Sequence, residues 1–158
     1  GEDGRRISAH TPVRGLSNET TFHEDTKDVD ILDGHIWRMA EKVSSRAKAK
    51  DIAGRVVTLK LKRSDHGLIT RRQSLRHPTQ IADTIYRTAR GLFDAAAPHP
   101  TYRLLGVGLS ELTPGTEADL TADLLDPGAD KRIRAERAAD AIRGRFGDAA
   151  IIKGRALR

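Results

Sequence analysis

Alternating and helical runs of hydrophobic residues divide the first 112 positions into six elements. A period of two, typical of a strand with one buried face, marks residues 16–22, 55–62, 68–75 and 102–110. A spacing of three and four residues, typical of a helix, marks residues 31–49 and a stretch that follows Pro78 and Thr79. The order β-α-β-β-α-β predicts an α+β domain of the split βαβ kind, with a four-stranded, antiparallel-rich sheet and two helices on one face.

The helix boundaries follow from local residues. Asp28 or Asp30 can cap the first helix, and its basic C-terminal end complements the helix dipole. Pro78 and Thr79 introduce the second helix, and Pro98 ends it. Its predicted buried stripe is Ile81, Ile85, Ala89 and Leu92.

The remaining segments lack this pattern. Residues 1–15 are predicted to be an extended lead-in, and residues 113–130 a flexible acidic linker bracketed by Pro-Gly pairs. Residues 131–146 predict a further helix within a basic tail that ends at residue 158, and residues 149–152 predict a short strand. A lone helix of ~16 residues is marginal in water, so the tail helix is expected to pack on another surface.

Charge is unevenly distributed along the chain. Residues 1–110 carry a net charge of +6, residues 111–130 a net charge of −6, and residues 131–158 a net charge of +6. Two basic blocks favour a polyanionic partner, although an ordinary solvated basic surface has the same composition. The chain has no cysteine, no apolar run near the ~18 residues of a membrane span and no hydrophobic N-terminal signal, which indicates a cytoplasmic protein without a membrane partner.

Catalytic and metal-binding patterns are not found in the sequence. The six histidines are scattered, and no two have the i, i+4 spacing that would place them together on a helix. Gly106 and Gly108 lie inside a strand and lack the third glycine of a dinucleotide fingerprint, so close packing against a helix is the expected reason for them. We therefore predict no catalytic residue and no metal or other cofactor in this chain.

The basic faces of two strands are the candidate binding surface. Alternation turns Val57, Leu59 and Leu61 to one side of a strand and Lys60 and Lys62 to the other. The uncovered face of the sheet is expected to show these lysines together with Arg71 and Arg72 of the hairpin partner. Backbone amides and short hydroxyls nearby can also donate to phosphates, which positions a protein on nucleic acid without reading its sequence. The alternative is the ordinary solvated face of an antiparallel sheet.

Four motifs in order resemble the little finger domain of the Y-family translesion DNA polymerases, and most closely its bacterial members. Residues 13–22 with Asp25 resemble the segment that opens that domain, and residues 57–62 its Val-Thr-Leu-Lys-Leu-Arg strand. Residues 70–75 with Pro78-Thr79 resemble its Thr-Arg-Ser-x-Thr-Leu…Pro-Thr stretch. Residues 103–112 match its closing Arg-Leu-Leu-Gly-Val-Gly-Leu-Ser-x-Leu.

The resemblance implies a little finger domain over residues 16–112, preceded by the end of a thumb domain in residues 1–15. Such a domain follows the template–primer duplex through its phosphates, while the catalytic domains of the same polymerase, with their magnesium ions, lie elsewhere in the parent protein. The residues expected to contact DNA are Arg14, Ser17, Asn18, Lys60, Lys62, Arg63, Thr70, Arg71, Arg72, Gln73 and Ser74.

A sliding clamp is the second partner that the resemblance implies. Residues 121–125 resemble the short clamp-binding peptide Gln-x-Asp-Leu-Phe, with Asp123, Leu124 and Leu125 as the contacting residues. Thr121 stands where that peptide has glutamine, and Leu125 where it has an aromatic residue. The same residues also suit the capped start of a minor helix.

Two other functions are compatible with the fold. A stand-alone RNA-binding module could use such a sheet, but sheets of that type stack bases on strand aromatics, whereas the outward positions here are Lys, Arg, Thr and Ser. A purely structural scaffold is the third possibility, and salt-sensitive binding to DNA would exclude it.

Overall fold

The computed structural model describes residues 15–119 and 127–156. Contacts within the chain divide it into two compact units, one up to Ala118 and one from Asp119 onward. The first unit contains the sheet and two helices, and the second contains a long helix.

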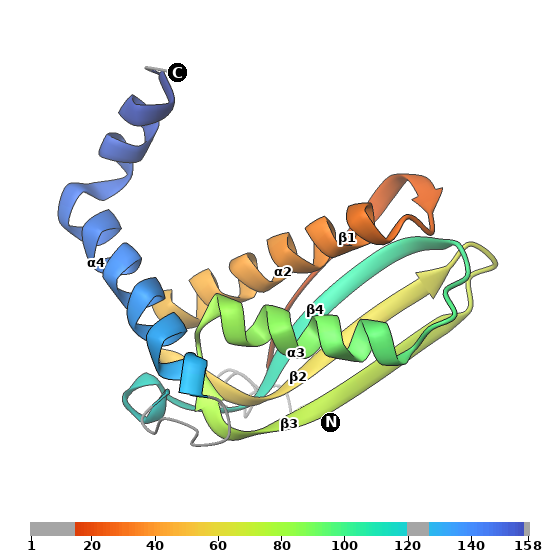
Figure 1. Ribbon diagram of the computed structural model, residues 1–158, viewed down its shortest axis with the longest axis horizontal. Helices are drawn as coiled ribbons and strands as arrows, with labels where there is room; N and C mark the ends of the chain where they lie inside the picture. The colour runs from red at the N-terminus through yellow and green to blue at the C-terminus, as the bar shows by residue number, and fades with distance from the viewer. Residues whose placement is uncertain (1–14, 120–126, 157–158) are drawn as a thin grey trace, which may run out of the picture. The chain divides into compact units, whose positions relative to one another are not determined.

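The first unit is built on one four-stranded sheet (Figure 1). Its strands are β1 (Gly15–Thr26), β2 (Ile52–Arg63), β3 (Leu68–Thr79) and β4 (Tyr102–Pro114), in the spatial order β1-β4-β2-β3. All three pairings are antiparallel. β1 and β2 are therefore parallel to each other with β4 between them, which is a split βαβ unit and confirms the predicted fold class.

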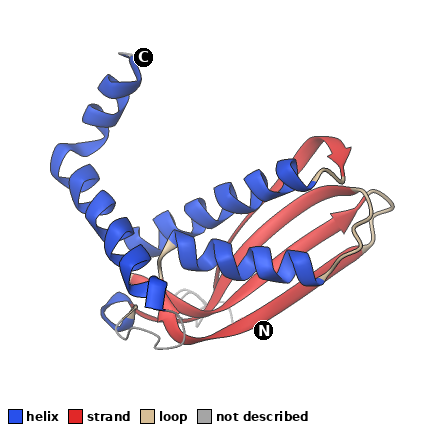
Figure 2. Ribbon diagram, in the orientation of Figure 1, coloured by secondary structure: helices blue, strands red, loops and turns tan. Residues whose placement is uncertain are grey.

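Helices α2 (Val29–Ala49) and α3 (Ala82–Ala95) both cover the same face of this sheet, as Figure 2 shows. The Asp28 side chain caps α2 by accepting hydrogen bonds from the backbone N–H groups of Asp30 and Ile31. Asp28 is thus the cap, and the alternative, Asp30, lies inside the first turn. Neither of these two helices lies on the opposite face of the sheet.

The start of α3 differs from the prediction. Pro78 and Thr79 belong to the end of β3, and the helix begins at Ala82. The φ angle of proline is compatible with extended backbone, and the end of an edge strand accepts a residue without an N–H donor. Pro78 therefore lies in β3 and not at the start of the helix. Ile81, Ile85 and Ala89 are buried as predicted, although Ile81 precedes the first helical residue. Ala82 and Phe93 complete the buried stripe, whereas Leu92 is only partly buried.

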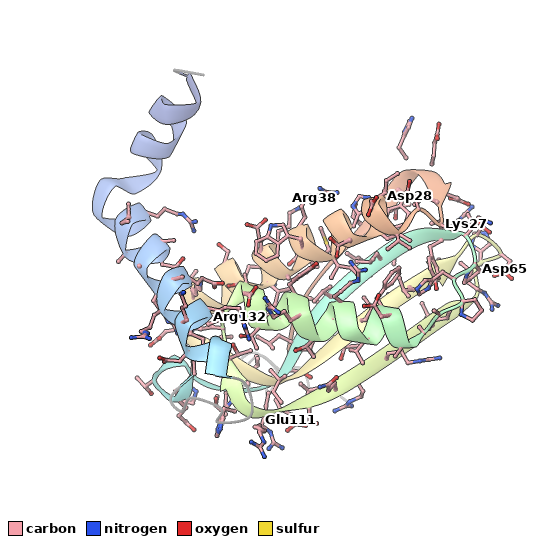
Figure 3. All side chains as sticks on the ribbon, viewed as in Figure 1. Lys27, Asp28, Arg38, Asp65, Glu111 and Arg132 are labelled. Atoms are coloured by element: carbon pink, nitrogen blue, oxygen red, sulfur yellow. The ribbon has the colours of Figure 1, made fainter. Side chains whose placement is uncertain are left out.

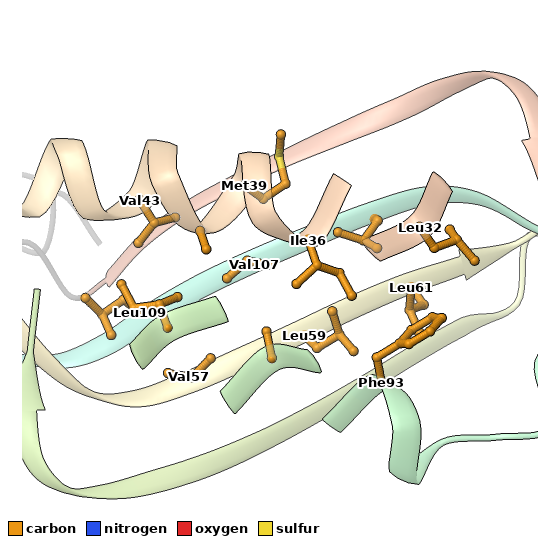
Figure 4. Packing of buried hydrophobic residues seen from close by; sticks show 14 of the residues in the cluster. Leu32, Ile36, Met39, Val43, Val57, Leu59, Leu61, Phe93, Val107 and Leu109 are labelled. Atoms are coloured by element: carbon orange, nitrogen blue, oxygen red, sulfur yellow. The ribbon is translucent and has the colours of Figure 1, made fainter. Parts of the chain in front are cut away.

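The core lies between the sheet and the two helices (Figure 4). Leu32, Ile36, Met39 and Val43 of α2 face inward-pointing residues of the central strands. Those strand residues are Val57, Leu59, Leu61, Leu105, Val107 and Leu109, which are all at most 1% exposed. The predicted inward set of β2 is therefore confirmed.

His99 closes one end of this core. Its ring stacks on Phe93 with centroids 3.9 Å apart, and its Nδ1 lies 2.9 Å from the hydroxyl of the buried Tyr102. Burial lowers the pKa of His99 below its usual value of 6.5, with Asp94 and Arg90 acting in opposite directions. Protonation is therefore unfavourable in the folded state.

The low pKa of His99 predicts a pH-dependent stability. At pH values between the folded pKa of His99 and about 6.5, the unfolded chain binds a proton that the folded chain does not. The free energy of unfolding should therefore be highest above this pH range and should decrease as the pH falls through it. Urea unfolding from pH 7.5 to 5 should show this decline. His99→Phe should reduce the slope, and the same change at His23, which is exposed on β1, should not. Equal slopes for both variants would contradict the prediction.

The C-terminal region also differs from the sequence-based prediction. β4 continues to Pro114 and is followed by a 3-10 turn, η1 (Gly115–Glu117), so the first residues of the predicted linker are structured. The predicted helix 131–146 is part of a longer helix, α4 (Pro127–Ala156), and the predicted strand 149–152 is wrong. Gly147 and Asp148 separate residues 146 and 149, but a glycine inside a helix costs only about 1 kcal/mol relative to alanine, and the helix continues through both residues. None of the described helices is both long enough and apolar enough to cross a bilayer.

Candidate nucleic-acid interface

The helix-free side of the sheet is the candidate interface, and strand register defines its members. Ser17 of β1 pairs with Gly108 of β4, Gly108 with Thr58 of β2, and Thr58 with Arg72 of β3. The next row is Glu19, Gly106, Lys60 and Thr70. Because paired residues point to the same side and alternate along each strand, these rows form one surface. We call it the open face: Gly15, Ser17, Glu19, Thr21, Val56, Thr58, Lys60, Lys62, Leu68, Thr70, Arg72, Ser74, Leu104, Gly106, Gly108 and Ser110. Val56 and Leu104 have the parity of this face but are buried.

Six of the predicted contact residues lie on the open face, namely Ser17, Lys60, Lys62, Thr70, Arg72 and Ser74. Arg71 and Gln73 do not, because they pair with Leu59 and Val57, whose side chains point toward the helices. The expectation that both neighbouring arginines lie on the uncovered face is therefore wrong for Arg71. Adjacent residues of a strand point to opposite sides, and only Arg72 has the right parity.

Three further predicted residues have other surroundings or lie outside the described part. Asn18 faces the helix side, where its Oδ1 accepts a 2.9 Å hydrogen bond from Arg46 of α2. Arg63 lies at the β2–β3 turn, 3.1 Å from Asp65, which is labelled in Figure 3. The backbone N–H of Gly67 and then Arg63 lower the pKa of Asp65, so this carboxylate belongs to the turn. Arg14 lies outside the described residues, as do Asp123, Leu124 and Leu125 of the predicted clamp peptide.

Two acidic residues partly neutralise the open face. The Nζ atom of Lys60 is 3.0 Å from a carboxylate oxygen of Glu19. Arg72 and Arg55 both approach Glu111, at 3.7 and 3.5 Å. Lys62 has no ion pair among the described residues. Arg55, Glu19 and Glu111 were missed at the sequence level, because their roles depend on which strands become neighbours.

The paired glycines lie on the open face and not against a helix. A Cβ on Gly106 would meet Glu19 Cβ at 3.0 Å, and one on Gly108 would meet Ser17 Cβ at 3.6 Å. The expected packing against a helix is therefore wrong, because both positions have the parity of the helix-free side. Their effect is a strip without side chains along the central strand β4, where another molecule can approach the backbone closely.

The chemistry of this surface suits phosphate binding. It offers ammonium, guanidinium and hydroxyl donors, and none of its members is aromatic. Among the described residues, no three His, Cys, Asp or Glu side chains lie together in a way that could hold a metal ion. Donors of this kind position a protein on a nucleic-acid backbone, whereas recognition of single-stranded bases relies on aromatic stacking.

Comparisons with known proteins identify one group of relatives. A family model described as the impB/mucB/samB family C-terminal domain matches residues 13–122. A DNA polymerase IV of Caulobacter vibrioides is 39% identical over 158 residues, which is 100% of this chain and 39% of that relative. A DNA polymerase IV of Brucella melitensis is 42% identical over 154 residues, covering 98% of this chain and 34% of the relative. The chain thus spans well under half the length of these relatives.

Solved structures agree with this grouping. The little finger domain of PolIV, in a complex with the beta-clamp processivity factor, matches with a TM-score of 0.53 and 26% identity over 70% of this chain and 99% of that one. A Y-family DNA polymerase chimera matches with a TM-score of 0.56 over 66% of this chain and 30% of that one. Its sequence identity of 14% means that this second match supports the fold alone.

Proposed function

Because the chain belongs to the impB/mucB/samB family and carries the little finger domain of a Y-family DNA polymerase, as its motifs predict, we propose that its open face binds template–primer duplex DNA without reading sequence. The domain would act as the DNA-gripping accessory part of a polymerase that copies damaged templates. The observation that carries this proposal is the open face itself, a polar and basic sheet surface with a glycine strip along its centre.

The distribution of donors favours phosphate contacts. Lys60, Lys62 and Arg72 lie on β2 and β3, and the hydroxyls of Ser17, Thr58 and Ser74 lie on the same surface. Each phosphate neutralised by such a cation releases counterions, which gives affinity that depends on salt but not on sequence. The central glycines allow the duplex backbone to approach β4 without a side chain in between.

A stand-alone RNA-binding module is less well supported. Sheets that bind single-stranded RNA stack bases on exposed aromatic residues of their central strands. The described aromatic residues of the strands, Phe22 and Tyr102, are instead buried or partly buried on the helix side.

We propose that this domain is part of a larger protein in which DNA binding and polymerisation belong to different domains. Polymerisation and its magnesium ions would belong to catalytic domains that this chain does not include, with residues 1–15 as the end of the thumb. Residues 16–112 would be the DNA-binding domain of a bacterial cytoplasmic protein. The start of the expected linker 113–130 belongs to β4 and η1, and its end belongs to α4, which continues into the basic tail 131–158. Asp123, Leu124 and Leu125 would bind a sliding clamp, and the complex of a related little finger domain with its clamp supports that part.

The two adjacent arginines of β3 provide the test. Affinity for primer–template duplex should fall steeply with salt and vary little with sequence. Arg72→Ala should weaken binding roughly three- to tenfold and reduce the slope of log K against log salt by about 0.9, the value for one lost phosphate contact. Fluorescence anisotropy at several salt concentrations measures both quantities.

Arg71→Ala is the matched control, because it removes the same charge one position away on the helix side. It should change affinity by less than about twofold, since it loses only long-range attraction. Equal losses for the two variants would place the duplex elsewhere, and absence of any salt-dependent binding by the unaltered protein would exclude the proposed function.

A further inference from the structure

Glu111 lies between two arginines that come from different strands. Its Oε1 is 3.5 Å from Nη2 of Arg55 on β2, and its Oε2 is 3.7 Å from Nη2 of Arg72 on β3. The three side chains remain 48 to 65% exposed. Glu111 is labelled in Figure 3, where nitrogen-bearing side chains lie beside it. One carboxylate therefore serves as counterion to two guanidinium groups at the surface.

The backbone of Glu111 is in an unusual conformation. Its φ is 53°, in the left-handed region that non-glycine residues rarely adopt. The residues on either side stay in the β2–β4 ladder, Ser110 opposite Val56 and Leu112 opposite Gly54. Such strain persists only where the surroundings enforce it, and it is concentrated at functional sites. At Glu111, the strained backbone carries the carboxylate that contacts Arg55 and Arg72.

We propose that Arg55 and Arg72 form a phosphate-binding site for the DNA backbone, and that Glu111 occupies this site until a phosphate of the duplex displaces it. This inference rests on the proposed function, because it assigns a role to residues on and beside the open face. A carboxylate and a phosphate compete for the same guanidinium donors, and both can bridge two arginines.

The distances from Glu111 to the two arginines indicate that displacing its carboxylate costs little free energy. Charge-assisted hydrogen bonds of Arg to an oxyanion are about 2.7–2.9 Å long, and both contacts of Glu111 are longer. Exposed ion pairs of this kind contribute little to stability. A phosphate that approaches closely would therefore replace Glu111, whose negative charge would remain nearby and weaken the complex. Glu111 thus limits how tightly the domain holds a duplex.

Removal of the carboxylate tests the site. Glu111→Gln keeps the size of the side chain and should tighten duplex binding roughly threefold, within the range of one exposed charge pair. Glu111→Gly suits the positive φ, also removes the carboxylate, and should give a similar gain. Both gains should be lost when Arg55 and Arg72 are replaced by alanine, because no donors then remain for the phosphate to take over.

Glu41→Gln is the control for net charge. Glu41 is exposed on α2, the helix layer that covers the other face of the sheet, so it lies about a helix diameter (~10 Å) or more from the sheet, comparable with the Debye length of ~10 Å at 0.1 M salt. It should change affinity by less than about 1.5-fold. Anisotropy with one duplex at 0.1 M salt measures all the variants.

The outcomes separate this inference from the proposed function. Tighter binding by both Glu111 variants, lost in the double arginine background and absent in Glu41→Gln, supports the competing carboxylate. Unchanged binding by the Glu111 variants, with Arg72→Ala still weakening the complex, overturns the inference and leaves the proposed function intact. A gain that survives loss of both arginines also overturns it, because the effect would then be general electrostatics.

Discussion

Phe93→Ala should lower the free energy of unfolding by about 3–5 kcal/mol, a large effect for a single substitution. Phe93 belongs to α3, and its side chain is fully buried in the core. The ring of His99 stacks on it with the ring centroids 3.9 Å apart. Truncation removes the apolar surface of the ring and leaves a cavity that the rigid sheet cannot close. It also removes the ring that supports His99 beside the Tyr102 hydroxyl.

Leu92→Ala is the matched comparison on the same helix. Leu92 is only partly buried, so its truncation should cost about 1–2 kcal/mol. Equilibrium unfolding in urea, followed by circular dichroism, measures both values. If the two variants were equally destabilised, Phe93 would not be the residue that anchors α3.

The difference between these two residues shows what the sequence can predict about α3. Ile85 and Ala89 continue either to Leu92, by a step of three, or to Phe93, by a step of four. Both steps are compatible with a helical stripe. The choice depends on the crossing of α3 over the sheet, which places Phe93 against His99, whose ring in turn lies against Tyr102. Both of these residues come after the helix. Local periodicity does not contain that information.

The alternating pattern of the strands predicted more of the fold than the periodicity of α3 did. Alternation placed Val57, Leu59 and Leu61 on one side of β2, and all three are buried. The split βαβ order followed from six elements in sequence and is confirmed. The error at residues 149–152 has the opposite cause, because four apolar residues in a row fit a strand or a helix equally well, and only the continuous helix around them decides.

The sequence could predict that the candidate site is polar and basic, but not which residues of the four strands form it. Lys60 and Lys62 could be assigned to one face from β2 alone. The contribution of β3 depended on register, which brings Arg72 beside Thr58 and leaves Arg71 on the other side. Glu111 and Arg55 are 56 residues apart, and only the pairing of β2 with β4 brings them together. The Gly106 and Gly108 strip likewise depends on β4 being a central strand.

Replacing Lys60, Lys62 and Arg72 together with alanine should weaken duplex binding on the order of a hundredfold at ~0.1 M salt. Each lost phosphate contact is expected to cost about 1 kcal/mol under screening, and 1.4 kcal/mol corresponds to tenfold. The loss includes an indirect part. Glu19 pairs with Lys60 and Glu111 with Arg72, so both carboxylates would be left without these cations, on or beside the same surface, to repel phosphate.

The salt dependence distinguishes direct contacts from a change in overall charge. Loss of three phosphate contacts should flatten the slope of log K against log salt by about 2.7 units. A control that replaces Arg38, Lys42 and Lys50 removes the same net charge from α2 and its C-terminal end, on the other layer of the domain. It should weaken binding only severalfold and leave the slope nearly unchanged, because the separation approaches a Debye length. A similar slope change in both triple variants would mean that affinity comes from diffuse charge, and the open face would then have no special role in binding DNA.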